Sequence, residues 1–420
     1  MNKIIGFLKL SLHNQLVGYL IGFQSGKNIL IFDPVFYHNE QRPTLSLITH
    51  PNFPNASKLL STQWKQHQRL HPLFSNLLPE GALRSLISHS LKIHLDNEFM
   101  LFSHLGQDLP GALIATPLHP DEVPPYILSQ CEHCQISPTM DTTLEKRFSL
   151  AGVQMKFSMQ EINGRYTVTH SGKQGGDWII KTPSIQHQAV PQNEYSTMKL
   201  ATLTGIDIPE VRLIQLGKLN NLPSINLPDE EFAYMIKRFD RNNDKRIHSE
   251  DFAQILVKYP HEKYQGANYE QIGRVLYQYS GNGLADVQQF ARRLLVNILL
   301  ANGDAHLKNW SLLYDNKYTP RLSPAYDIVM TRAYIENEKS FALNLGRTKY
   351  WYDVNFSHFE YWSKKADIPW RAIKPHLIDT LDKARIQWHT ALKELPMLDS
   401  HKQILQQHWK SLHKDFSIIK

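Results

Sequence analysis

A proline-rich polar stretch separates this chain into segments that each need a core of their own. Between Pro117 and Thr143 the sequence carries five prolines among polar residues, a composition typical of a linker. Because domains usually hold roughly 100–200 residues, a chain of 420 residues should form two or three. We therefore place an N-terminal subdomain at 1–118, the linker at 119–146, a strand-rich lobe at 147–240 and a helical lobe at 241–420.

The hydrophobic pattern changes along these segments. Short apolar runs at 4–8, 16–20 and 29–32 predict a small antiparallel sheet, and helical spacing begins after Pro72. After the linker, strand patterns dominate, with one helix at 193–203, and the last part of the chain is mostly helical. The sequence thus predicts an α+β protein in which a strand-rich lobe meets a helical lobe, and such junctions commonly hold ligand-binding clefts.

Composition and charge exclude several classes of protein. A chain that is 42% hydrophobic and 20% charged is neither disordered nor collagen-like. It lacks a run of about 18 apolar residues, so we expect a soluble, cytoplasmic protein with no membrane partner. The net charge of +7 attracts anions such as nucleotide phosphates, nucleic acid or an acidic protein, without choosing among them.

The two cysteines of the sequence, Cys131 and Cys134, cannot build a disulfide framework and suit a reducing compartment. With His133 they could offer ligands to zinc, but no second pair follows at the spacing of a zinc finger or ribbon. We interpret them as two thiols of the linker.

The segment Asn302–Asn309 concentrates polar side chains directly after an apolar helix predicted at 286–301. Asp304 and Asn309 have the separation found between the base and the magnesium-binding asparagine of the protein-kinase catalytic loop. A loop of this length can aim a carboxylate at a substrate hydroxyl and an amide oxygen at a metal. An ordinary turn at the end of a helix, with exposed polar residues, would show the same sequence pattern. The loop alone therefore does not distinguish a catalytic segment from such a turn.

Two further segments supply complementary groups. Asp327 follows a proline-containing turn and suits a second magnesium ligand, although it could equally cap a short helix. Lys181 ends an apolar strand and Glu194 lies in the next helix, as in the lysine–glutamate pair that holds ATP phosphates in kinases. A lysine at the end of a strand is usually just solvated. The pair therefore supports a kinase-like site only in combination with the 302–309 loop.

A phosphate-binding loop and a hinge complete the candidate site. The segment 149–156 contains Gly152, which permits close backbone approach, with Gln154 and Lys156 as side-chain donors. It matches neither the dinucleotide-binding glycine fingerprint nor the Walker pattern. Between the lobes, the segment 236–241 follows a strand where a kinase hinge would present backbone groups to adenine.

Taken in order, these segments resemble the HipA-type serine/threonine kinases, the toxins of bacterial HipBA modules. The resemblance also extends to the N-terminal part through Leu77-Leu78-Pro79-Glu80-Gly81 and Gly111-Ala112-Leu113, and it rests on Ser149–Lys156, Asp177–Lys181, Asn193–Tyr195, Arg238–Arg241, Glu250–Phe252, Asn302–Asn309 and Ser323–Ile328.

The resemblance implies a two-lobed protein-kinase-like α+β fold with an additional β-rich N-terminal subdomain and a mostly helical C-terminal lobe. It implies Asp304 as the general base and Asn309 and Asp327 as Mg²⁺ ligands. Residues implied to line the ATP site are Ala151, Gly152, Val153, Gln154, Met155, Lys156, Lys181, Glu194, Lys237, Arg238, Phe239, His306, Asn309, Tyr326 and Asp327.

The resemblance also implies regulation and partners. Ser149 matches the serine that such kinases phosphorylate on themselves, and the added negative charge would repel ATP from the phosphate loop. Val153 and Met155 depart from the usual Ala-Gly-Ala-Gln-Glu-Lys loop, and Met155 stands where that loop has its acidic residue. The implied substrate is an aminoacyl-tRNA synthetase, typically the glutamyl enzyme, whose modification stalls translation. The implied partner is a helix-turn-helix antitoxin, HipB, that binds operator DNA.

Two other functions fit the same sequence. One is a catalytically idle co-repressor that docks a DNA-binding partner. Against it stands the joint presence of Lys181, Asp304, Asn309 and Asp327, which a scaffold does not need. The other is a small-molecule phosphotransferase, since aminoglycoside and choline kinases place Asp and Asn in a similar loop.

Overall fold

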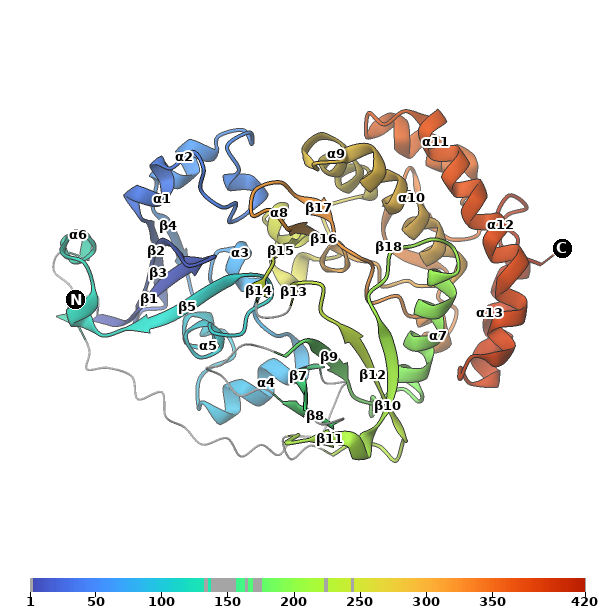
Figure 1. Cartoon of the computed structure of the whole chain (residues 1–420), viewed down its shortest axis with the longest axis horizontal. Helices are drawn as coiled ribbons and strands as arrows, with labels where there is room; N and C mark the ends of the chain where they lie inside the picture. Colours follow the sequence, from blue (N-terminus) through green and yellow to red (C-terminus); the bar gives the residue numbers. More distant parts are fainter. Residues whose placement is uncertain are drawn as a thin grey trace.

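The computed structural model describes residues 3–131, 135–136, 156–162, 165–168, 176–222, 226–242 and 245–419. Figure 1 shows three regions: an N-terminal sheet with short helices, a second sheet, and a helical region that ends at the C-terminus. The helices and strands below are named as in that figure.

The N-terminal region is built on an antiparallel sheet. Its strand order is β4(Trp64–His67), β3(Lys27–Phe32), β2(Gln15–Phe23), β1(Lys3–Leu12) and β5(Leu113–Leu118), and β6(Gln135–Ile136) pairs with β1. His13 and Asn14 join β1 to β2 with positive φ angles of 49° and 65°, the conformation of a two-residue hairpin turn. The predicted strands at 4–8, 16–20 and 29–32 are therefore confirmed.

Short helices cover this sheet and enclose an apolar core. The core joins side chains such as Leu10, Leu20 and Leu30 from the sheet to Phe74 and Phe102 from the helices. The helices of this region are α1(Pro34–His38), α2(Ala56–Ser61), α3(Pro72–Ser75), α4(Gly81–Ser90), α5(Glu98–Leu105) and α6(Pro125–Leu128).

The second sheet forms the strand-rich lobe. Its strand order is β10(Val211–Gln215), β12(Phe232–Lys237), β9(Trp178–Lys181), β7(Lys156–Ile162), β8(Arg165–Val168) and β11(Leu219–Asn220). Helix α7(Val190–Thr202) packs against β12 and β10. It begins before the predicted helix because Pro191 is tolerated in a first turn, and Gly205, with φ of 82°, follows its end. From the N-terminal region, Leu86 of α4 joins the core of this lobe.

The helical lobe contains the largest apolar core. Asn282 caps α10 through a hydrogen bond to Ala285, so this helix begins before the predicted residue 286. The helix then packs against α9 and α12. The helices here are α8(Phe252–Ile255), α9(Tyr269–Tyr279), α10(Gly283–Leu299), α11(Phe356–Lys365), α12(Trp370–Glu394) and α13(Asp399–Ser411). The strands are β13(Arg241–Asn242), β14(Lys245–Arg246), β15(His248–Asp251), β16(Ser311–Tyr314), β17(Arg321–Leu322), β18(Ser340–Leu345) and β19(Thr348–Tyr350).

Buried ion pairs tie the N-terminal region to the rest of the molecule. Asp240 accepts hydrogen bonds from the guanidinium groups of Arg238 and Arg241 and from the backbone N–H of Gly111. Both arginines also contact Asp108, which lies just after α5. The cluster therefore connects residues of the N-terminal region to the end of the strand-rich lobe, and removal of one of its partners would leave an uncompensated buried charge. In the described part of the chain, no helix combines the length and apolar character needed to span a membrane.

Candidate active site

Lys181 lies at the junction of the two lobes and joins groups from distant segments. It ends β9, where it is paired with Lys156 of β7 and Tyr234 of β12. Its Nζ atom lies 2.5 Å from Oε1 of Glu194 on α7 and also forms an ion pair with Asp327. Lys156, directly across the strand pair, reaches the same Asp327 carboxylate at 3.4 Å. The structure thus brings Lys156, Lys181, Glu194 and Asp327 together.

The ionic partners within this cluster fix its charges against the effect of burial. Lys181 is 4% and Glu194 1% exposed. Burial opposes the charged form of Lys181, but Asp327 and Glu194 outweigh it and raise the pKa of the ammonium. Burial likewise opposes the Asp327 carboxylate, yet Lys156 and Lys181 hold its pKa far below the usual range. The cluster therefore keeps an ammonium and a carboxylate side by side at neutral pH.

Asp327 has a special backbone conformation. Its φ of 60° is in the left-handed region, which non-glycine residues adopt uncommonly, although aspartate does so more readily than most. The next residue, Ile328, accepts a hydrogen bond from Thr197 Oγ1 of α7 at 2.5 Å. Helix α7 thus positions both Glu194 and the chain that follows Asp327.

The segment after α10 is a closed loop built by its own polar side chains. Asn302 donates to Asn297 Oδ1 at 2.7 Å, and Asn309 Nδ2 donates to the Asp304 carbonyl oxygen at 3.0 Å. The last part is a short 3₁₀ turn, η6(Leu307–Asn309). Asp304 and Asn309 are thus held in a fixed arrangement by a hydrogen bond within the loop.

The carboxylate of Asp304 is accessible, with 49% of its side chain exposed. It accepts a hydrogen bond from the hydroxyl of Tyr264, and His306 Nε2 lies 4.0 Å from it. Burial lowers the pKa of His306 to about 4, so the imidazole is neutral near pH 7. An exposed carboxylate that already binds a hydroxyl group has the geometry of a general base.

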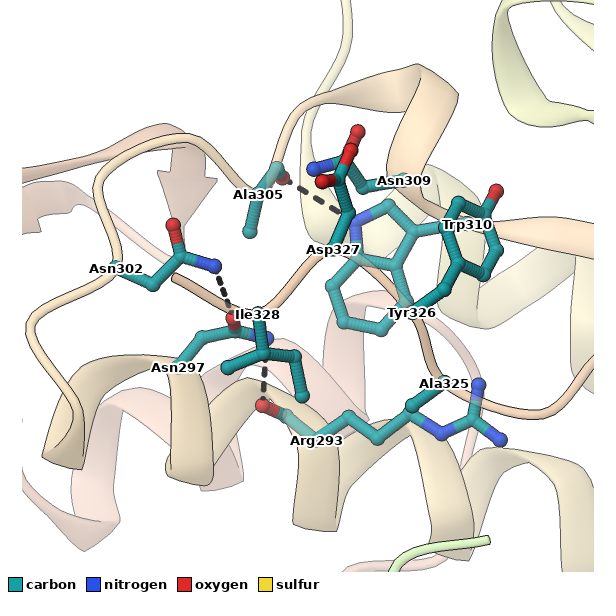
Figure 2. Close-up of a pocket in the computed structure, with 10 residues that line it drawn as sticks. All are labelled: Arg293, Asn297, Asn302, Ala305, Asn309, Trp310, Ala325, Tyr326, Asp327 and Ile328. Carbon is teal, nitrogen blue, oxygen red and sulfur yellow. Dashed lines mark hydrogen bonds between the residues drawn. The ribbon is translucent and has the colours of Figure 1, made fainter. Parts of the chain in front are cut away.

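Asn309 and Asp327 line the same small polar cavity, which has room for about one water molecule (≈ 10 Å³) (Figure 2). Because Asn309 Nδ2 is used within the loop, Oδ1 remains as its ligand atom. One amide oxygen and one carboxylate suit Mg²⁺, which takes few protein ligands alongside phosphate oxygens. A cation here would compete with the two lysines for Asp327. No cluster of three His, Cys, Asp or Glu side chains suited to a metal occurs among the described residues.

The predicted hinge does not offer free backbone N–H groups at Lys237 and Arg238, but it places an aromatic side chain near Asp327. The backbone N–H groups of Lys237 and Arg238 donate to the carbonyl oxygens of Glu210 and Asp177, so neither is free for a base. The Arg238 side chain belongs to the buried cluster with Asp240. Phe239 lies against Tyr326, with ring centroids 5.5 Å apart, so an aromatic pair bridges the two lobes beside Asp327.

Some predicted residues lie outside the described part of the chain. They are Ser149, Ala151, Gly152, Val153, Gln154 and Met155 of the phosphate loop, and His133 and Cys134 of the linker. Lys156, at the end of the predicted loop, is described and begins β7.

The sequence did not reveal the residues from other parts of the chain that contact the 302–309 loop. Glu80, from the N-terminal region, forms ion pairs with Lys263 at 3.0 Å and with Lys308 at 2.9 Å. Tyr264, next to Lys263, bonds Asp304. The segment around Glu80 is part of the family resemblance, and this was the one sequence feature that could have pointed to these contacts. The pairing itself joins positions 183 residues apart for Lys263 and has no local pattern.

Comparison with known proteins agrees with this geometry. The family model described as HipA-like C-terminal domain matches residues 148–388, and the HipA N-terminal domain matches residues 8–116. A Sinorhizobium fredii protein named "Putative kinase Y4dM" is 38% identical over 394 residues, which is 93% of each chain. The serine/threonine-protein kinase toxin HipA of Shewanella oneidensis is 26% identical over 299 residues, or 64% of each chain.

A solved structure confirms the predicted fold. The chain matches HipA in the complex of Shewanella oneidensis HipA, HipB and operator DNA with a TM-score of 0.70 and 20% identity, over 96% of this chain and 95% of that one. The arrangement is therefore the predicted two-lobed kinase-like α+β fold. The family models, which together match most of the sequence, and the relative that is similar over nearly the full length show that this chain is a kinase-like enzyme of the HipA family.

Proposed function

We propose that this protein is an ATP-dependent serine/threonine-protein kinase that transfers the γ-phosphoryl group of ATP to a serine of a protein. The observation that carries the proposal is the ion pairing of Lys181 with both Glu194 and Asp327. In kinases, a strand lysine held by a helix glutamate binds nucleotide phosphates beside the metal-binding aspartate. The exposed carboxylate of Asp304, on the loop that also carries Asn309, supplies the second half of the site.

The roles follow from these positions. The acceptor oxygen attacks the γ-phosphorus, the bond to the β–γ bridging oxygen breaks, and Asp304 accepts the acceptor's proton. Lys181 and Lys156 neutralise phosphate charge, while Phe239 and Tyr326 offer aromatic faces to adenine. Asn309 and Asp327 would hold Mg²⁺, which, when bound, neutralises charge on the transferring phosphates. Positioning and electrostatics supply most of the acceleration in such a reaction.

The same proposal includes a biological role. The matched Shewanella structure contains HipA with HipB and operator DNA, so a HipB-like helix-turn-helix antitoxin is the proposed partner, which would bring the chain to DNA indirectly. As the toxin of such a module, the protein would modify an aminoacyl-tRNA synthetase, the glutamyl enzyme first among candidates, and so inhibit translation. Phosphorylation of Ser149 by the protein itself would silence it.

Transfer of label from γ-³²P-ATP tests the reaction. The protein kinase proposed here labels protein bands in an extract, a small-molecule phosphotransferase labels only small products, and an idle co-repressor labels neither. Asp304→Gln should abolish transfer and toxicity while leaving nucleotide binding largely intact. Asp315→Asn, an exposed aspartate in the turn after β16, is the matched control and should keep full activity. Full transfer by Asp304→Gln would remove Asp304 from the role of base.

A further inference from the structure

The hydroxyl of Tyr264 occupies a position that the proposed reaction reserves for the acceptor. It donates a hydrogen bond to Oδ1 of Asp304. A general base must lie within hydrogen-bond reach of the hydroxyl whose proton it removes. An incoming serine and Tyr264 therefore compete for the same carboxylate.

The neighbourhood of Tyr264 makes it a surface residue that covers Asp304 and not a core residue. Its side chain is 42% exposed, and its ring meets His306 edge to face with centroids 5.1 Å apart. The residue lies in a short turn between η5(Pro260–Glu262) and α9, and Gly266 in this turn has a φ of 67°. The ring thus covers one side of the base from a surface turn.

Contacts on both sides hold this turn in place. Lys263 forms the ion pair with Glu80 of the N-terminal region, at 3.0 Å. The carbonyl oxygen of Lys263 accepts the backbone N–H of Leu307 in the catalytic loop, at 3.2 Å. The covered state of Asp304 is therefore maintained by one contact to the loop and one to the N-terminal region.

We infer that Tyr264 is an acceptor-selecting residue, whose hydroxyl must leave Asp304 before an acceptor hydroxyl can bind there. This inference rests on the proposed kinase function. Moving Tyr264 costs a hydrogen bond to a charged group, and binding energy from remote parts of a large acceptor can offset that cost. Water and small alcohols bring no such energy. The tyrosine thus favours a protein acceptor over water, a form of induced-fit specificity.

Removal of the hydroxyl tests this inference by a gain of activity, which a folding defect would not produce. In Tyr264→Phe, Oδ1 of Asp304 loses its competing donor and can bind a water molecule instead. This water attacks the γ-phosphorus, the bond to the β–γ bridging oxygen breaks, and Asp304 accepts a proton, giving ADP and phosphate. With γ-³²P-ATP and Mg²⁺ but no added acceptor, phosphate release should rise about tenfold or more, the factor expected for one hydrogen bond to a charged group. Lys263→Met, which frees the turn from Glu80, should raise it less. Tyr318→Phe, whose ring is 43% exposed at a distant turn, should not raise it.

Thermal denaturation without nucleotide gives a second readout. The Tm changes of Tyr264→Phe and Asp304→Ala should not add in the double variant, because both remove the same bond. Additive Tm changes would overturn the inference. So would phosphate release that stays the same or falls in Tyr264→Phe while this variant still labels itself. If neither the wild type nor any variant releases or transfers the γ-phosphate, the proposed function and this inference both fail. Non-additive Tm values would then show that the contact exists without that role.

Discussion

The side chain of Asn193 forms two hydrogen bonds with the backbone of Met330. Its Nδ2 group donates to the Met330 carbonyl oxygen at 3.1 Å, and its Oδ1 atom accepts the Met330 N–H at 3.0 Å. Asn193 precedes Glu194 on α7, and Met330 lies three residues after Asp327. The asparagine therefore connects the two carboxylates that pair with Lys181, although 137 residues separate it from Met330.

Replacement of this asparagine should weaken both stability and transfer. Asn193→Ala leaves the N–H of Met330 without a partner in a buried setting, which costs about 1–3 kcal/mol of unfolding free energy, while the Met330 carbonyl oxygen still accepts the N–H of Ala333. We expect phosphoryl transfer to fall as well, since Asp327 loses its support. Thermal or urea denaturation and γ-³²P transfer measure the two effects. Gln407→Ala, an exposed position on α13, is the control, and equal behaviour of the two variants would contradict this role of Asn193.

Removal of the central lysine should separate stability from activity. Lys181→Met leaves the buried Glu194 carboxylate without its cation, while Asp327 keeps only Lys156. We expect a loss of about 3–5 kcal/mol of unfolding free energy together with loss of ATP binding and transfer. The double variant Lys181→Met/Glu194→Gln removes one stranded charge, so its Tm should recover in part while transfer stays absent. A double variant no more stable than the single one would show that the ion pair is not what destabilises it.

The pH dependence of stability should report on Glu250. This residue is 2% exposed and accepts hydrogen bonds from Ser46 Oγ, Leu47 N–H and the Tyr314 hydroxyl. Burial raises its pKa to about 7 against an ordinary value of 4.5. Between these values the folded protein holds a proton that the unfolded chain has released, so the contribution of Glu250 to stability falls as the pH rises through this window.

Comparison of the wild type with Glu250→Gln isolates this effect because other titrating groups are common to both. The relative stability of the wild type should decrease from pH 5 to pH 8, by an amount on the order of 3 kcal/mol. Denaturation at the two pH values measures it, with the exposed Glu336→Gln as control. A difference between wild type and Glu250→Gln that stays constant with pH would rule out this titration.

Self-modification should map to a single serine. Ser149→Ala is expected to stop labelling of the protein by γ-³²P-ATP while transfer to a separate protein substrate continues. The reason is that the serine is a target of the reaction and not part of its machinery. Mass spectrometry of the labelled wild type checks the assignment, and a phosphopeptide from another site would refute it.

Local pattern was sufficient for much of the site. The strand that ends at Lys181, the helix that carries Glu194 and the loop from Asn302 to Asn309 were each predicted from hydrophobic period and polar spacing, and the structure contains all three. Those features depend on residues close together in sequence. The ends of α7 and α10 differed from the prediction by a few residues, because Pro191 and the Asn282 cap extend the helices at their starts.

The sequence by itself determined most of the strands and helices, the polar residues of the proposed active site, and the family to which the chain belongs, because periodicity and short motifs are local properties. Only the tertiary structure decided that Tyr264 covers Asp304, that Glu80 of the N-terminal region holds Lys263 and Lys308, and that Asn193 holds Met330. These contacts join positions 40 to 228 residues apart, and the pair of Glu80 and Lys308 has the largest separation. They join segments that meet only in the folded chain, so no local sequence pattern indicates them.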